Sequence, residues 1–218
     1  MRVCAAVCVR GHRMFKNVKW LFLDVGSTLL DESIAYGHRF QDLAVRANLP
    51  YETVYETALA FYKENKKGDK ETAKQLGVPL SKWYSEDEML YPDAEKCLKA
   101  LHSRYKIGII ANQEPGTKER LARHGILSYI DLVVASAEEG VAKPDHRIFG
   151  IALERSGCAP QEAIMIGDRI DNDILPAKEM GMRTIWIKQG FGQYWMITRE
   201  TEQPDSTVNS LTELCTLL

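Results

Sequence analysis

Several residues that could take part in acid–base, metal-binding or anion-binding chemistry directly follow short apolar runs. Asp24 follows WLFL, with Gly26 and Thr28 in the turn after it, Asn112 follows KIGIIA, and Asp168 follows AIMIG. A carboxylate at the end of a buried strand loses hydration, so we expect it there only when a partner or a function compensates. Asp24 is therefore the first candidate for a nucleophile and metal ligand.

Two more charged residues belong with this set. Lys143 precedes Pro144 after a fourth apolar run, LVVA, and Asp173 follows Asp168 by five positions. Carboxylates from different strands suit a hard cation such as Mg²⁺. A lysine and the backbone N–H groups of a turn suit an anion. If the fold brings these residues together, they would form a magnesium and phosphate site.

The elements that must position these residues alternate along the chain. Apolar strands are expected at 20–24, 107–111, 132–135, 163–167 and 184–187, and helices at 93–104, 115–124, 144–156, 173–180 and after Ser210. Continuous apolar strands that alternate with helices predict a parallel sheet covered on both faces. The predicted fold is therefore α/β, a Rossmann-like doubly wound sheet whose carboxyl edge binds ligands.

A helical insertion is expected between the first two strands. About eighty residues separate these strands, whereas a parallel crossover needs about a dozen. Residues 31–91 have helical periodicity, with a polar break at KENKKGDKE, and are predicted to form a cap domain that can cover the site. The core domain is predicted at 17–30 and 92–218, and residues 1–16 as a disordered extension.

Composition excludes some classes of partner. Lys and Arg total 28 against 30 Asp and Glu, so no basic excess favours nucleic acid. No apolar run approaches the ~20 residues of a membrane-spanning helix. The five scattered cysteines form a poor disulfide framework, which favours a reducing, cytoplasmic compartment. We expect a monomer or homodimer with a small-molecule partner, and an aromatic cluster, Phe191, Tyr194 and Trp195, packed against the sheet edge.

Four motifs, DVGST, IIAN, AKP and GDRIDND, follow one another in this order, with the helical segment between the first two. In these motifs the chain resembles the haloacid dehalogenase (HAD) superfamily from about residue 19 to residue 218. The resemblance implies that Asp24 is the nucleophile and that Lys143 neutralises the phosphoryl group. It also implies that Mg²⁺ is bound by Asp24, the Gly26 backbone carbonyl and Asp168, with Asp173 in support. Phosphate binding is assigned to Thr28, Asn112 and Lys143.

Two departures from the family pattern concern catalysis. Gly26 replaces the second aspartate of family phosphatases, which protonates the leaving group and then activates water, and loss of such a group costs about 10²–10⁴-fold. Ala111 replaces a Ser or Thr, a donor whose loss costs about 10²–10³-fold. Five nearby residues are candidates to replace the missing acid: Asp31, Glu32, His38, Gln113 and Glu114.

Three functions remain open on these residues. The first is a Mg²⁺-dependent phosphatase for a small phosphorylated metabolite, which works through an aspartyl-phosphate at Asp24 and prefers good leaving groups such as acyl or aryl phosphates. The second is a catalytically impaired phosphometabolite-binding or regulatory protein. The third is a 2-haloacid dehalogenase, in which Gly26 does no harm because halide leaves unprotonated and Arg39 could contact the halide or carboxylate. Retention of Asp168 argues against the third.

Overall fold

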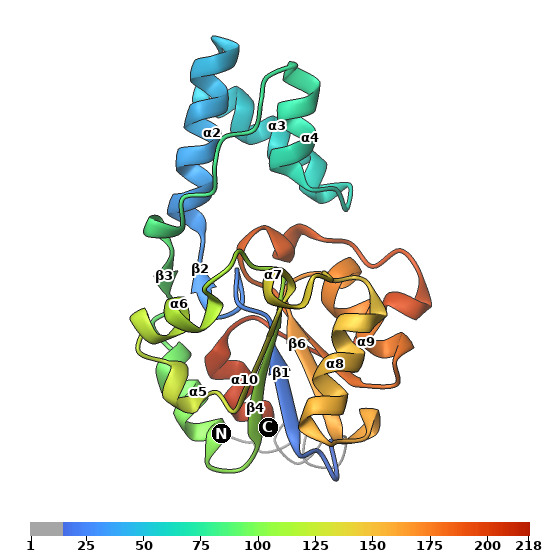
Figure 1. Cartoon of the computed structure of the whole chain (residues 1–218). Coiled ribbons are helices and arrows are strands. Elements are labelled where there is room, and N and C mark those ends of the chain that lie inside the picture. Colours follow the sequence, from blue (N-terminus) through green and yellow to red (C-terminus); the bar gives the residue numbers. More distant parts are fainter. Residues whose placement is uncertain (1–14) are drawn as a thin grey trace, which may run out of the picture.

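The computed structural model describes residues 15–218, and its centre is a six-stranded parallel sheet with the order β5-β4-β1-β6-β7-β8 (Figure 1). The strands are β1 (Trp20–Leu23), β4 (Lys106–Ala111), β5 (Leu132–Ala135), β6 (Ala163–Gly167), β7 (Arg183–Ile187) and β8 (Ser206–Val208). This confirms the predicted α/β fold. The sequence analysis missed β8, which is three residues long and carries two hydroxyl side chains, so it has no apolar run.

Helices cover both faces of the sheet because its strands are apolar on both sides. Along β1, Leu21 and Leu23 join one buried cluster and Phe22 joins the other, as the alternation of a strand requires. Figure 1 shows α5 and α10 on one side of the sheet and α8 and α9 on the other. The core helices are α5 (Ala94–His102), α6 (Thr117–Arg123), α7 (Ser136–Glu139), α8 (His146–Ser156), α9 (Leu175–Glu179) and α10 (Leu211–Leu217).

The helical insertion forms a cap above the edge at which β1 ends (Figure 1). It contains α2 (Ser33–Ala47), α3 (Tyr51–Lys63) and α4 (Gly68–Leu76), which bury a shared apolar cluster. At its base β2 (Leu30–Asp31) pairs antiparallel with β3 (Met89–Leu90), so both connections to the core run side by side. α4 begins inside the segment that was expected as a polar break.

Short helical turns connect several of these elements. They are η1 (Ser85–Asp87), η2 (Leu127–Tyr129), η3 (Pro160–Glu162), the π-helical turn η4 (Ile170–Ile174), η5 (Gly190–Tyr194) and η6 (Glu200–Glu202). No helix in residues 15–218 is both long and apolar enough to cross a membrane.

Two predicted boundaries were wrong. Phe15, assigned to a disordered extension, is 7% exposed and packs into the core, so the ordered chain includes part of 1–16; the rest of that prediction concerns residues outside the described range. The helix expected from Pro144 begins at His146. Its N-cap is Asp145, whose carboxylate accepts a hydrogen bond from the Arg147 backbone N–H.

The aromatic cluster after β7 divides between two neighbours. Trp195 is buried beside Trp186, in agreement with the expected packing against the sheet. Phe191 instead stacks on Tyr62 of the cap, with 4.4 Å between ring centroids, and meets Tyr36 edge-on at 5.0 Å. The core therefore contacts the cap through an aromatic side chain of η5, because the loop after β7 ends directly beneath the cap.

Candidate active site

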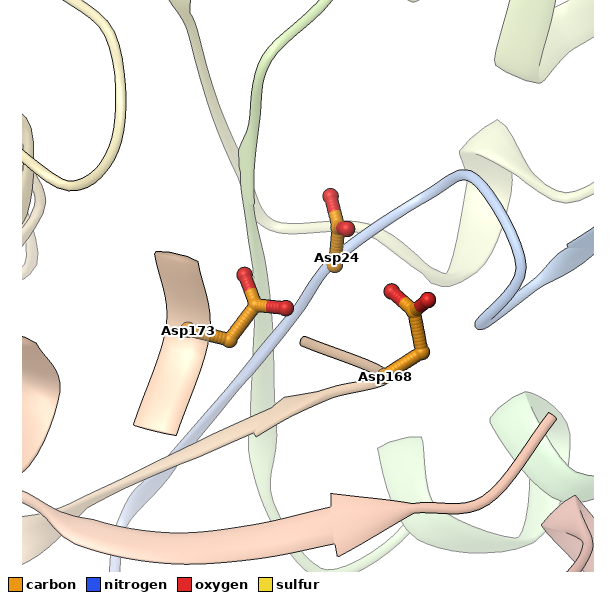
Figure 2. Close-up of side chains that lie close together, drawn as sticks. All are labelled: Asp24, Asp168 and Asp173. Atoms are coloured by element: carbon orange, nitrogen blue, oxygen red, sulfur yellow. The ribbon is translucent and has the colours of Figure 1, made fainter. Parts of the chain in front are cut away.

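Three carboxylates converge at the carboxyl edge of the sheet. Asp24 directly follows β1, Asp168 directly follows β6, and Asp173 lies in η4. β1 and β6 are adjacent parallel strands, and the Asp24 backbone N–H donates to the Ile166 carbonyl at 2.9 Å, so the first two acids end side by side. One carboxylate oxygen from each acid lies within 4.8 Å of the others, and Figure 2 shows the three side chains together. Their spacing suits a shared cation.

Lys143 joins this cluster from the loop before α8. Its Nζ lies 2.9 Å from Asp24 Oδ1 and 2.6 Å from Asp173 Oδ1, and its side chain is almost fully buried. Asn112 holds the loop in place. Its Nδ2 donates to the Lys143 carbonyl at 2.8 Å, and its Oδ1 accepts from the Lys143 N–H at 2.7 Å. Asn112 therefore positions the lysine, and its contact with phosphate stays a prediction.

The electrostatics of the cluster leave a surplus of negative charge. Burial disfavours the ammonium of Lys143, but Asp173 and Asp24 outweigh it and raise its pKa. Burial, followed by the charges of Asp173 and Asp24, raises the pKa of Asp168 well above its usual range. Burial also raises the pKa of Asp173, opposed by Lys143, to about 6. Three acids thus face one lysine, and their oxygen ligands fit Mg²⁺, which would supply the missing positive charge.

Two adjacent cavities lie at this edge. The first, of about 140 Å³, is lined by Asp24, Gly26, Lys143 and Asp168, among others. The second, of about 250 Å³, extends between cap and core and is lined by residues that include Arg39, Lys67, Lys70, Trp83 and Arg120. Both cavities share six lining residues: Glu32, Tyr36, Tyr62, Asn112, Gln113 and Arg169. Asp24 therefore lies at the inner end of a space that the cap covers.

Thr28 does not line either cavity. Its side chain is fully buried, and its Oγ1 has no hydrogen-bond partner within residues 15–218. The predicted contact of Thr28 with phosphate therefore has no support in this geometry. The neighbouring Ser27, which adopts a left-handed backbone conformation (φ 52°), lines the inner cavity instead.

The five candidates for the missing acid differ in which cavities they line. The Asp31 carboxylate accepts from the Ser33 N–H at 2.9 Å, and exposed His38 pairs with Asp87 at 2.6 Å; neither lines either of these two cavities. Gln113 lines both cavities but is an amide, which is not a general acid at ordinary pH.

Glu114 lines only the larger cavity, whereas Glu32 lines both. Glu32 accepts a hydrogen bond from Ser27 Oγ at 2.8 Å. Burial raises the pKa of Glu32 to about 8, with Asp24 and Glu88 adding to the shift and Ser27 opposing it. Of the five, Glu32 is therefore the only carboxylic acid that lines both cavities.

Ser27, Lys67 and Lys70 are among the cavity-lining residues that the sequence analysis did not single out. Ser27 lies within DVGST and could have been proposed from its place in the motif. The two lysines belong to the polar segment KENKKGDKE, in which neighbouring lysines carry no signal of which one faces the site.

Comparisons with known proteins agree with this geometry. The sequence profile of the haloacid dehalogenase-like hydrolases matches residues 18–181. The chain is 32% identical to the glyceraldehyde 3-phosphate phosphatase of Pyrococcus abyssi over 197 residues, 79% of this chain and 82% of that one. It is 38% identical to the Escherichia coli pyrimidine 5'-nucleotidase YjjG over 134 residues, 58% and 56% of the two chains.

A similar solved structure is the putative HAD-hydrolase YfnB of Bacillus subtilis bound to magnesium. Its TM-score is 0.66 at 20% identity, over 91% of this chain and 97% of that one, which indicates the same fold. Three observations agree on the family: the helical cap, the geometry of the site and the profile match over most of the chain. The chain belongs to the haloacid dehalogenase-like hydrolases.

Proposed function

We propose that this hydrolase is a Mg²⁺-dependent phosphatase that acts on a small phosphorylated metabolite through an aspartyl-phosphate at Asp24. The observation that carries the proposal is the position of the Asp24 carboxylate, 2.9 Å from Lys143 Nζ and within 4.8 Å of carboxylate oxygens of Asp168 and Asp173. A nucleophilic carboxylate, Asp24, beside a buried cation, Lys143, and two further acids is an arrangement suited to phosphoryl transfer.

The chain's own residues account for the steps. An Asp24 oxygen attacks phosphorus while the bond to the leaving oxygen breaks, and that oxygen takes a proton. Water then attacks the same phosphorus, gives up a proton and releases inorganic phosphate from Asp24. Lys143 neutralises charge near Asp24 throughout. Asp24, Asp168 and the Gly26 carbonyl would hold Mg²⁺, with Asp173 in support, and bound Mg²⁺ would neutralise phosphoryl oxygens.

The cavity under the cap favours a small anionic substrate. Lys67 and Lys70 line it and form no salt bridge with any residue in the described range. Burial, followed by the nearby charges of Arg169 and Lys70, lowers the pKa of Lys67, and the smaller opposing effects of Asp171 and Asp69 do not cancel it. The named relatives act on glyceraldehyde 3-phosphate and pyrimidine nucleotides, which are anions of this kind.

No observation favours the dehalogenase alternative. The Arg39 guanidinium, its candidate halide or carboxylate ligand, donates from Nη1 to Asp69 Oδ2 at 2.6 Å and from Nη2 to the Ser81 carbonyl at 3.3 Å, and it lies over the Trp83 ring. Arg39 is therefore engaged within the cap. Halide release from a 2-haloacid without Mg²⁺ would revive that alternative.

The test is phosphate release from a panel of phosphorylated metabolites and acyl phosphates, with and without Mg²⁺. We expect turnover that requires Mg²⁺ and falls to the uncatalysed rate in Asp24→Asn. Mass spectrometry of the acid-quenched wild type should find one phosphoryl group on the peptide that contains Asp24. The matched control is Glu56→Gln, an exposed cap acid remote from both cavities, which should keep the wild-type rate. Unchanged turnover in Asp24→Asn would overturn the proposal.

A further inference from the structure

The space beside Gly26 is already filled by a carboxyl group. A Cβ atom added to Gly26 would lie 2.4 Å from Oε1, 2.8 Å from Cδ and 2.9 Å from Oε2 of Glu32. A Cβ atom essentially never makes non-bonded contacts this short, so a larger residue fits at position 26 only if the carboxyl end of the Glu32 side chain moves. The glycine and the glutamate are therefore a matched pair, and the chain has not simply lost a carboxylate at this point.

Local structure explains how Glu32 reaches this position. The chain turns after β1, where Leu29 and Leu30 N–H groups both donate to the Val25 carbonyl, and returns beside Gly26 through the bridge between Gly26 and Leu30. Glu32 follows as the N-cap residue of α2. The side chain is then fixed by Ser27, whose Oγ donates to Oε2 at 2.8 Å. Glu32, six positions after Gly26, is thus placed directly beside it.

The rest of the carboxyl group faces the cavities. Glu32 forms no salt bridge with the described residues, and Arg120, which lines the larger cavity with it, pairs with Glu88 at 3.5 Å. Its Oε1 has no hydrogen-bond partner among the side chains and backbone of residues 15–218. Since Glu32 and Asp24 both line the inner cavity, Oε1 can reach a substrate atom held at the nucleophile.

We propose that Glu32, the N-cap residue of α2 at the start of the cap, is the catalytic acid and base of this enzyme in place of the family's second aspartate. The inference rests on the proposed phosphatase function. In the first step the Glu32 carboxyl gives its proton to the leaving oxygen as the bond from that oxygen to phosphorus breaks. In the second step the resulting carboxylate takes a proton from the attacking water as the bond from phosphorus to Asp24 breaks, which restores both residues.

The role predicts a dependence on the leaving group. In Glu32→Gln, which keeps the volume and the Ser27 contact, we expect hydrolysis of an alkyl phosphate such as glycerol phosphate to fall by about 10²–10⁴-fold. With p-nitrophenyl phosphate, whose leaving group needs no proton, the variant should release one rapid equivalent of nitrophenol per site and then slow down, because phosphorylated Asp24 accumulates. The affinity for inorganic phosphate and the unfolding temperature should stay unchanged.

A variant cycle tests whether Gly26 and Glu32 share one space. Gly26→Asp alone should lower the alkyl phosphatase rate, because two carboxyl groups compete for one volume. Gly26→Asp combined with Glu32→Ala should be faster than Glu32→Ala alone, because a carboxyl group then returns to the same place. Glu56→Gln, an exposed cap acid that lines neither cavity, is the control and should behave like the wild type.

Three results would overturn the inference. The first is a wild-type rate on both substrates in Glu32→Gln. The second is an equal fall in rate on both substrates in Glu32→Gln, together with a lower unfolding temperature. The third is a Gly26→Asp enzyme, with Glu32 still present, that is faster than the wild type. The last would instead support a binding protein with impaired catalysis. Because Asp24→Asn tests the phosphatase function separately, an inactive Asp24→Asn beside a wild-type-like Glu32→Gln would reject the role of Glu32 alone.

Discussion

Replacement of Lys143 by methionine should expose the charge balance of the site. The lysine side chain is 1% exposed and contacts Asp24 at 2.9 Å and Asp173 at 2.6 Å, and the Asp173 side chain is fully buried. Methionine keeps most of the volume but removes the cation. Removal of one partner from a buried ion pair costs about 3–5 kcal/mol, because the other charge is left without compensation. We expect a loss of this size in the free energy of unfolding at pH 7 in EDTA.

The loss should shrink as the pH falls. Burial raises the pKa of Asp173 to about 6, above its ordinary range, although Lys143 opposes the shift, and removal of the lysine should raise that pKa further. The folded variant then binds more protons than its unfolded state in this range, so its stability rises towards low pH. Between pH 7 and pH 5 we expect the deficit to decrease by roughly 1–2 kcal/mol, since one unit of pKa corresponds to about 1.4 kcal/mol.

Urea titration followed by circular dichroism, in EDTA at pH 7 and pH 5, measures both quantities. The control is Lys82→Met, in which an exposed pair with Glu86 at 2.9 Å is removed; no measurable change is expected, because water screens such pairs. A deficit below about 1 kcal/mol at pH 7, or a deficit that is the same at both pH values, would refute the account of Lys143 as the compensating charge of the cluster.

Two further predictions concern the metal site. A Cβ on Gly192 would lie 2.4 Å from the Asp168 carbonyl oxygen and 2.5 Å from Asp168 Oδ2, so Gly192→Ala should destabilise the fold by about 1–3 kcal/mol and weaken Mg²⁺ binding in calorimetry. Gly150→Ala, with no atom within 4 Å of the added carbon, should instead be neutral or stabilising by up to about 1 kcal/mol; equal losses in both would disprove the steric argument. Mg²⁺ at 100 times its Kd should stabilise the wild type by about 2.7 kcal/mol, seen as a higher unfolding temperature in scanning fluorimetry. Asp168→Asn should lose most of this gain, and an equal gain in that variant would remove Asp168 from the ligand set.

Much of the fold could be predicted because its signals are local. IGIIA, which follows Lys106, and AIMIG are apolar throughout, and such runs are typical of strands that are covered on both faces. Five of the six strands and the helical insertion were predicted in this way. β8 was missed because STV has no apolar pattern, and α4 was missed because its first turn belongs to the polar segment KENKKGDKE.

The site could be predicted only in part, because only some of its residues are marked by a local sequence signal. Asp24, Asp168 and Asp173 could be proposed from their places after strands, because parallel strands end at one edge of a sheet. The contacts of Lys143 with two of these acids, and the use of Asn112 to hold the lysine's backbone, depend on how two loops pack against each other. No spacing in the sequence reports such contacts.

The sequence by itself determined that an acid ends the first strand, that a cap follows it, and that glycine stands where family phosphatases have a second aspartate. Only the tertiary structure decided what that glycine means. The pattern of residue types along the chain predicts which segments are buried. Which side chain fills a given space depends on how distant segments pack against each other. In this chain the turn after β1 brings Glu32 against Gly26, and the apparent loss of a carboxylate becomes a change in the residue that supplies it.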